Sequence, residues 1–266
     1  MEKSKSVRWT REELLIVLNL YHKLHFGQMD ARQKVVIDLA ERMGRSANSV
    51  ALKLVNLASL DPVLKLRGIR GMPGSSKLDR ETWDEYHGNA ADLIPLAQEK
   101  FDALFTAGES ETTEVIPGKG VVRVSMPPVG ETETIRPAKQ RRGQTYFRDI
   151  VLNNYDNRCA LTGLPVRELL VASHILPWSG HAAERLNVKN GISLNRLHDS
   201  AFDRHLVSFD EEFRLVLSPK LKSIMLEESV AYQFEAFEGK TLRVPNDGIL
   251  PDLSFLSIHR KQLARI

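Results

Sequence analysis

Two histidines and an asparagine, set at fixed spacings inside an apolar framework, constrain the fold of this chain more than any other feature. His174 follows the short apolar run 169–172, which is typical of a strand that ends at the histidine. Asn190 and Gly191 come next and indicate a turn. His198 lies among apolar residues spaced by three and four, the pattern of a short helix. The sequence therefore predicts a strand-end histidine packed beside a helix that carries a second histidine.

Strand pairing around this segment can also be predicted. The apolar runs 159–161 and 169–172 flank the turn-forming residues 162–165, so we expect them to form a β-hairpin that ends at His174. Further along, the runs 206–209 and 214–217 alternate in polarity around an acidic turn and predict a second hairpin.

The order histidine, asparagine, histidine on a ββα unit resembles the HNH nuclease family. The resemblance covers roughly residues 147–217, and the runs 158–163, 174–179 and 202–203 are similar to a branch of restriction endonucleases. It implies an α+β fold whose C-terminal domain is a ββα-metal nuclease. Many members of the family also carry a structural zinc held by two Cys-x-x-Cys pairs, but Cys159 is the single cysteine here and excludes that site.

The resemblance also implies a role for each residue. Phosphodiester hydrolysis requires a base, a cation near the phosphate and stabilisation of the departing 3′ oxygen. His174 would be the general base, His198 would hold a divalent metal ion, and Asn190 would orient the loop that carries the base. The implied cofactor is Mg²⁺, with Mn²⁺ or Zn²⁺ as alternatives.

The chain departs from the family directly before His174, where many members have an acidic or histidine metal ligand and this chain has Ser173. A neutral hydroxyl is a poor ligand, so the missing charge is expected from Asp203 or from Asp199. On an ideal helix, positions 198 and 203 lie about 140° apart, so joint ligation with His198 requires the helix to end near residue 202. Asp199 lies about 100° from His198 and is only slightly better placed.

Length and composition limit the remaining classes of protein. With 266 residues, of which 42% are hydrophobic, the chain can bury more than one core. No apolar run reaches the length of a membrane span, and residues 1–6 lack the apolar core of a signal peptide. Together with the lone cysteine, this predicts a cytoplasmic protein with no membrane partner.

The N-terminal part is expected to be a helical module over residues 1–105. Its helices, turn glycine and small residues are similar to helix-turn-helix proteins, and a recognition helix would present Arg45, Asn48 and Lys53 to the major groove of DNA. Three-helix modules of this kind also serve as protein contacts, and that alternative remains open.

Residues 106–143 are rich in Gly, Pro, Thr and Glu and predict a linker, which leaves 144–266 as the nuclease domain. Lys and Arg exceed Asp and Glu in residues 1–72 and 136–266, whereas acids dominate between them. Clustered positive charge is expected of a protein that binds phosphate backbones. Directly before the nuclease segment, Arg141, Arg142 and Arg148 are therefore candidate DNA contacts.

The sequence thus predicts a divalent-metal-dependent endonuclease acting on double-stranded DNA, with a restriction or defence role implied by the resemblance. A homodimer would allow two sites to cut both strands. Two alternatives remain: a DNA-binding protein whose nuclease site has degenerated, as Ser173 suggests, or an RNA-directed, toxin-like nuclease.

Overall fold

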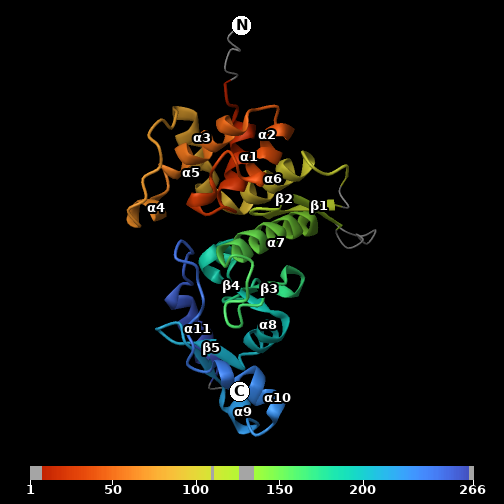
Figure 1. Ribbon diagram of the computed structural model, residues 1–266, viewed down its shortest axis with the longest axis vertical. Helices are drawn as coiled ribbons and strands as arrows, with labels where there is room; N and C mark the ends of the chain where they lie inside the picture. Colours follow the sequence, from red (N-terminus) through yellow and green to blue (C-terminus); the bar gives the residue numbers. More distant parts are fainter. Residues whose placement is uncertain (1–7, 109–110, 126–134, 264–266) are drawn as a thin grey trace. The chain divides into compact units, whose positions relative to one another are not determined.

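The computed structural model describes residues 8–108, 111–125 and 135–263, and for residues 135–139 and 141 it describes the backbone alone. The chain divides into two compact units, Met1–Tyr146 and Phe147–Ile266. Helices are combined with one two-stranded antiparallel sheet in the first unit and with two such sheets in the second (Figure 1), as the predicted α+β class requires. The division falls close to the expected boundary at 143–144. No helix in the described ranges is long and apolar enough to cross a membrane.

The first unit is mainly helical. Its elements, in chain order, are α1 (Arg11–Tyr21), the 3₁₀ helix η1 (Phe26–Gln28), α2 (Lys34–Arg42), α3 (Ala47–Ala58), α4 (Pro62–Leu66), α5 (Lys77–Gly88), α6 (Ala90–Ala103), β1 (Glu111–Ile116) and β2 (Gly120–Ser125). Thr10 and Glu13 form a capping box that begins α1, because each side chain satisfies a backbone N–H of the other residue. Helix α1 is the centre of the core, and its residues 14–21 are all buried.

Helices α2 and α3 have the predicted order, with Gly44 in the connecting turn at a φ of 64°. Helix α3 is nevertheless not presented as a recognition helix. Most of its residues are buried, and the segment around Gly71 crosses it so closely that a Cβ on Gly71 would lie 2.3 Å from the backbone N of Ser59. The exposed part of α3 is limited to residues such as Asn48 and Leu52, and the helix-turn-helix role of this module stays a prediction.

The segment 106–143, expected to be a linker, contains part of the first unit's core. Strands β1 and β2 form an antiparallel hairpin in which Thr113 is fully buried. Asp102 of α6 accepts hydrogen bonds from the hydroxyls of Thr112 and Thr113, and Asp38 of α2 accepts one from the backbone N–H of Val121. Composition alone misses this hairpin because its partners lie far away in the sequence.

Helix α7 (Ile135–Asn154) ends the first unit and begins the second. The later elements, in chain order, are η2 (Arg167–Leu169), β3 (Leu170–His174), η3 (Ala182–Glu184), η4 (Val188–Asn190), β4 (Gly191–Asn195), α8 (Arg196–Asp203), β5 (Val207–Phe209), β6 (Leu215–Leu217), α9 (Pro219–Ser223), α10 (Glu228–Gln233), η5 (Glu235–Phe237) and α11 (Leu253–Leu263).

The expected hairpin between 159–161 and 169–172 is wrong. Residues 159–161 form turns, and β3 pairs instead with β4, which begins at Gly191 after a long loop. Cys159 is fully buried, as expected, but lies outside any strand. The predicted second hairpin is confirmed as β5 and β6, whose register pairs Val207 with Leu217. Helix α11 packs on β5 and completes this core.

Candidate active site

Strands β3 and β4 and helix α8 bring the predicted polar residues to one end of a small ββα unit. His174 is the last residue of β3 and pairs with Gly191, the first residue of β4. One step further into the sheet, Ser173 pairs with Ile192. Helix α8 follows β4 directly, with Asn195 as its N-cap, and packs on both strands. The sheet therefore fixes the backbone of His174, while α8 sets the position of the acids opposite it.

The ring of His174 is held on three sides. It stacks on Phe147 of α7 with the ring centroids 3.8 Å apart, and it meets the edge of Trp178 at 5.4 Å. Its Nε2 lies 3.0 Å from the carbonyl oxygen of Arg185. A carbonyl can only accept a hydrogen bond, so Nε2 carries a proton and, in the neutral ring, Nδ1 is the atom with a free electron pair.

Arg185 also anchors the loop that provides this carbonyl. Its Nε donates a hydrogen bond of 2.7 Å to the backbone oxygen of Trp178, and its guanidinium lies 5.3 Å from the centre of the Trp178 ring. Burial lowers the pKa of His174, partly opposed by the Arg185 carbonyl and by the negative charge of Asp203. The histidine is therefore neutral, and able to accept a proton, at physiological pH.

Asn190 ties the two ends of the same loop together. Its Oδ1 accepts a hydrogen bond of 2.8 Å from the backbone N–H of Leu176, while its Nδ2 donates to the carbonyls of Leu176 and Glu184. The side chain is fully buried, so these bonds are shielded from water. This geometry suits an orienting role for Asn190, whose effect on catalysis stays a prediction.

Asp199 and Asp203 lie four residues apart on α8 and therefore share one face of the helix. Burial raises the pKa of Asp199, the nearby hydroxyl of Ser173 lowers it, and the negative charge of Asp203 raises it further. Burial also raises the pKa of Asp203, whereas the positive charge of Arg204 lowers it. The two carboxylates thus stand close together, beside Ser173 and His174.

His198 lies on the opposite side of α8. It is fully buried, and its ring nitrogens lie 3.0 Å from Asn195 Oδ1 and 2.9 Å from the carbonyl oxygen of Gln233. Helix α8 continues to Asp203, so the early helix end that joint ligation by His198 and Asp203 would need is not observed. With both ring nitrogens engaged in the core, His198 is placed to support the fold and not to hold a metal ion beside His174.

Cys159 belongs to this buried side as well. Burial raises the pKa of its thiol, and hydrogen bonds with His198 and Thr162 lower it, to about 7 overall. The thiol is buried beside His198 and has no exposed route to a substrate.

A divalent cation fits the donors on the exposed face of α8. Oxygen ligands suit Mg²⁺ and Mn²⁺, and Mg²⁺ is often held by one or two carboxylates together with substrate phosphates and water. Within the described ranges no group of three or more His, Cys, Asp or Glu side chains is arranged around a common point. Asp199 and Asp203 are two such carboxylates, four residues apart on one face of α8.

The sequence predicted both aspartates as metal ligands, but as alternative partners of His198 and not as a pair. The spacing of four residues between Asp199 and Asp203 was the available signal. Sequence reasoning missed Phe147 and Arg185, whose contacts with His174 arise from residues distant in the sequence or inside an irregular loop.

Two of the side chains predicted to contact DNA in the first unit, Lys53 and Arg45, instead form ion pairs within that unit. Lys53 donates to both carboxylate oxygens of Asp79 at 2.9 Å, and the Asp79 side chain is fully buried. Arg45 pairs with Glu13 at 2.8 Å and stacks on Trp9. The expectation that these side chains are exposed is wrong, because each neutralises a partner distant in the sequence. Asn48, in contrast, is exposed on α3.

Of the three arginines of α7 that were predicted to contact DNA, two form contacts within the protein. Arg148 donates hydrogen bonds to the carbonyls of Leu170 and Arg167, and so supports the start of β3. Arg142 forms an ion pair of 2.9 Å with Glu99. The side chain of Arg141 lies outside the described residues.

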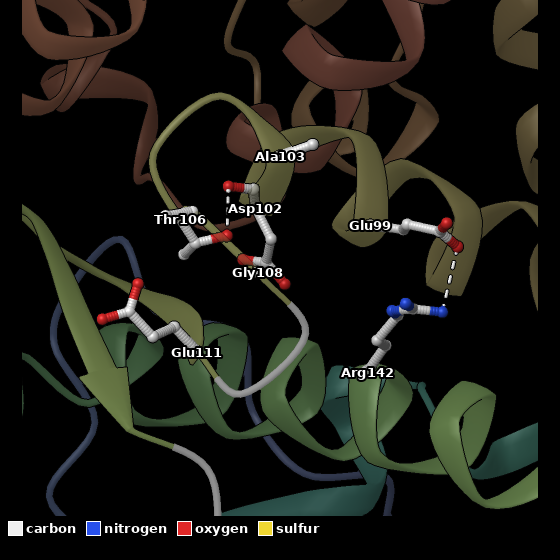
Figure 2. Close-up of a pocket in the computed structure, with 8 residues that line it drawn as sticks. Glu99, Asp102, Ala103, Thr106, Gly108, Glu111 and Arg142 are labelled. Carbon is white, nitrogen blue, oxygen red and sulfur yellow. Dashed lines mark hydrogen bonds and ion pairs between the residues drawn. The ribbon is translucent and has the colours of Figure 1, made fainter.

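Figure 2 shows a pocket in the first unit where Arg142 and Glu99 meet. Asp102 and Glu111 also line it. Asp102 is already engaged with Thr112 and Thr113, and none of the residues expected to act in catalysis lines the pocket. The chemistry-bearing cluster is instead the group around His174 in the second unit.

Comparison with known proteins identifies the same segment. A family model described as HNH endonuclease matches residues 159–210, which include β3, β4, α8 and β5. A search of curated proteins found no match.

Proposed function

We propose that this chain, whose residues 159–210 assign it to the HNH endonuclease family, is a divalent-metal-dependent enzyme that cuts double-stranded DNA. The observation that carries the proposal is the place of His174 at the end of β3, with its Nε2 held by the Arg185 carbonyl and with Asp199 and Asp203 on the neighbouring helix α8. This arrangement combines a neutral base with two carboxylates.

In the proposed reaction, Nδ1 of His174 takes a proton from the water that attacks phosphorus. The P–O3′ bond breaks, the 3′ oxygen takes up a proton from solvent, and the new end carries a 5′-phosphate. Asp199 and Asp203 would hold Mg²⁺ or Mn²⁺. When bound, the cation supplies positive charge that stabilises the phosphorus centre and the departing oxygen.

The other residues keep the base in place. The Arg185 carbonyl keeps the proton on Nε2, Phe147 fixes the ring plane, and Asn190 closes the loop. Ser173 does not make the site degenerate, because Asp199 stands next to it and provides the missing negative charge. Such an enzyme suits the restriction or defence role that the sequence resemblance implies.

Metal-dependent cleavage tests this proposal. Purified wild type, His174→Ala and, as a matched histidine control, His181→Ala are incubated with duplex DNA, single-stranded DNA and RNA in Mg²⁺, Mn²⁺ or EDTA. Unmodified, methylated and hydroxymethylated duplexes are included because a modification-dependent enzyme ignores plain DNA.

We expect wild type and His181→Ala to cut a duplex with metal and not with EDTA, and His174→Ala to lose cleavage. Cleavage confined to RNA would favour the RNA-directed alternative. Equal DNA binding by wild type and His174→Ala, without cleavage of any substrate, would favour a DNA-binding protein and overturn the enzymatic proposal.

A further inference from the structure

The exposed face of α8 carries positive charges on both sides of the carboxylate pair. His198, Ala201 and Phe202 are buried, whereas Arg196 and Arg204 are exposed. At about 100° and about 1.5 Å per residue, the residues from Arg196 to Arg204 that face outward fall within about 140° of one another, and the two arginines are about 12 Å apart along the helix axis. The carboxylates therefore lie on the same side of the helix as two exposed arginines, one at its start and one at its C-cap.

Within the described part of the chain, neither Arg196 nor Arg204 forms a salt bridge with Asp199 or Asp203. Arg204 donates instead to the backbone oxygen and the hydroxyl of Ser200, at 3.1 and 2.5 Å, which holds its side chain along the helix. Burial raises the pKa of Asp199, and the positive charges of Arg196 and Arg204 lower it.

An exposed guanidinium that is close to a carboxylate, yet does not bind it, is available for a second anion. Arginine suits phosphate because its planar fork can donate two parallel hydrogen bonds. A nucleic-acid strand that places one phosphate at the carboxylate pair also brings its neighbouring phosphates to the two ends of α8. Each arginine then meets a charge of the opposite sign.

We propose that Arg196 and Arg204 bind the backbone phosphates that flank the scissile phosphate on the cleaved strand. This inference rests on the proposed nuclease function and adds the substrate contacts that hold the strand over the site. The flanking phosphates keep the same charge throughout the reaction, so these contacts stabilise the bound substrate and the transition state equally. Their loss should therefore raise KM and leave kcat close to the wild-type value.

The test measures binding and cleavage separately. Arg196→Gln and Arg204→Gln are made in the His174→Ala background, and binding to a fluorescent duplex in EDTA is followed by anisotropy over a range of salt concentrations. Lys220→Gln, an exposed lysine of α9 in the same unit, is the matched control. Removing one phosphate contact should reduce the slope of log K against log salt by about 0.9.

We expect this reduction for each arginine variant and none for Lys220→Gln, with Arg196→Lys keeping the slope because it keeps the charge. In proteins with an intact His174, the Gln variants should show a raised KM and a wild-type kcat. If wild type cuts DNA but the Gln variants keep their slope and KM, this inference is overturned and the proposed function stands. If wild type cuts nothing, both are overturned.

Discussion

Replacing Gly191 with alanine tests whether the contact between β4 and α7 sets the position of His174. A Cβ on Gly191 would lie 2.3 Å from Cγ2 of Val151 and 2.9 Å from Cζ of Phe147, both closer than atoms can approach. Phe147 is the ring on which His174 stacks, and His174 is the strand partner of Gly191. The added methyl group must therefore displace Phe147 or the backbone at Gly191, and these are the two residues that hold His174.

The size of the effect follows from this overlap. Overpacking a closed core by one methyl group costs about 1–3 kcal/mol, so the free energy of unfolding should fall by that amount. A shift of the base by about 1 Å can cost about 100-fold in rate, so we expect kcat to fall by up to that factor while KM changes little. The two losses should appear together because one displacement causes both.

Urea unfolding followed by circular dichroism, together with cleavage kinetics, measures these changes. Gly180→Ala is the matched control, since a Cβ there meets no atom within 4 Å. Shortening the obstructing side chain in the double variant Gly191→Ala/Val151→Ala should make the two substitutions less costly together than the sum of their separate effects. A Gly191→Ala protein as stable and as active as Gly180→Ala would refute the reasoning.

Three further predictions concern other groups. Because burial lowers the pKa of His174, a pH series should show kcat falling only below about pH 6.5, where the imidazole takes up a proton; a fall beginning near pH 8 would contradict its role as base. Lys53→Met strands the buried carboxylate of Asp79 and should reduce the free energy of unfolding in urea by about 3–5 kcal/mol, with no change in the salt dependence of DNA binding. Asn190→Ala leaves the backbone N–H of Leu176 without its partner and should cost about 1–3 kcal/mol, with faster hydrogen exchange at that amide; unchanged exchange would show that Asn190 does not hold the loop.

Local patterns predicted α1, α2, α3 and α6 but not α4 or α5, because a cap such as Thr10 with Glu13 and a turn such as Gly44 act within a few residues. The same holds for the second hairpin, whose strands are separated by one tight turn. The strand partner of β3 was not predictable in this way. The run 159–161 is apolar, whereas 191–195 carries only Ile192 and Leu194 as apolar side chains, and its glycine packs closely against Val151 and Phe147 of α7.

In the candidate site, too, features set by local sequence were predictable, whereas contacts between distant residues were not. The motif identified His174 and Asn190, since their roles follow from a strand end and a loop. It placed the metal at His198 because a histidine is a more conspicuous ligand than an aspartate, whereas burial of that ring depends on the carbonyl of Gln233, far along the chain. Lys53 was misjudged for the same reason, because its partner Asp79 lies on another helix.

Binding of Mn²⁺ to the metal-free protein tests whether Asp199 and Asp203 hold a divalent cation, and it does not depend on finding the right DNA. Titration followed by electron paramagnetic resonance compares wild type with Asp199→Asn/Asp203→Asn and, as a control on the same helix, Ser200→Ala. We expect wild type and Ser200→Ala to bind one Mn²⁺ ion and the double variant to bind it at least about tenfold more weakly. Equal Mn²⁺ affinity in all three proteins would contradict a catalytic centre built on these two carboxylates.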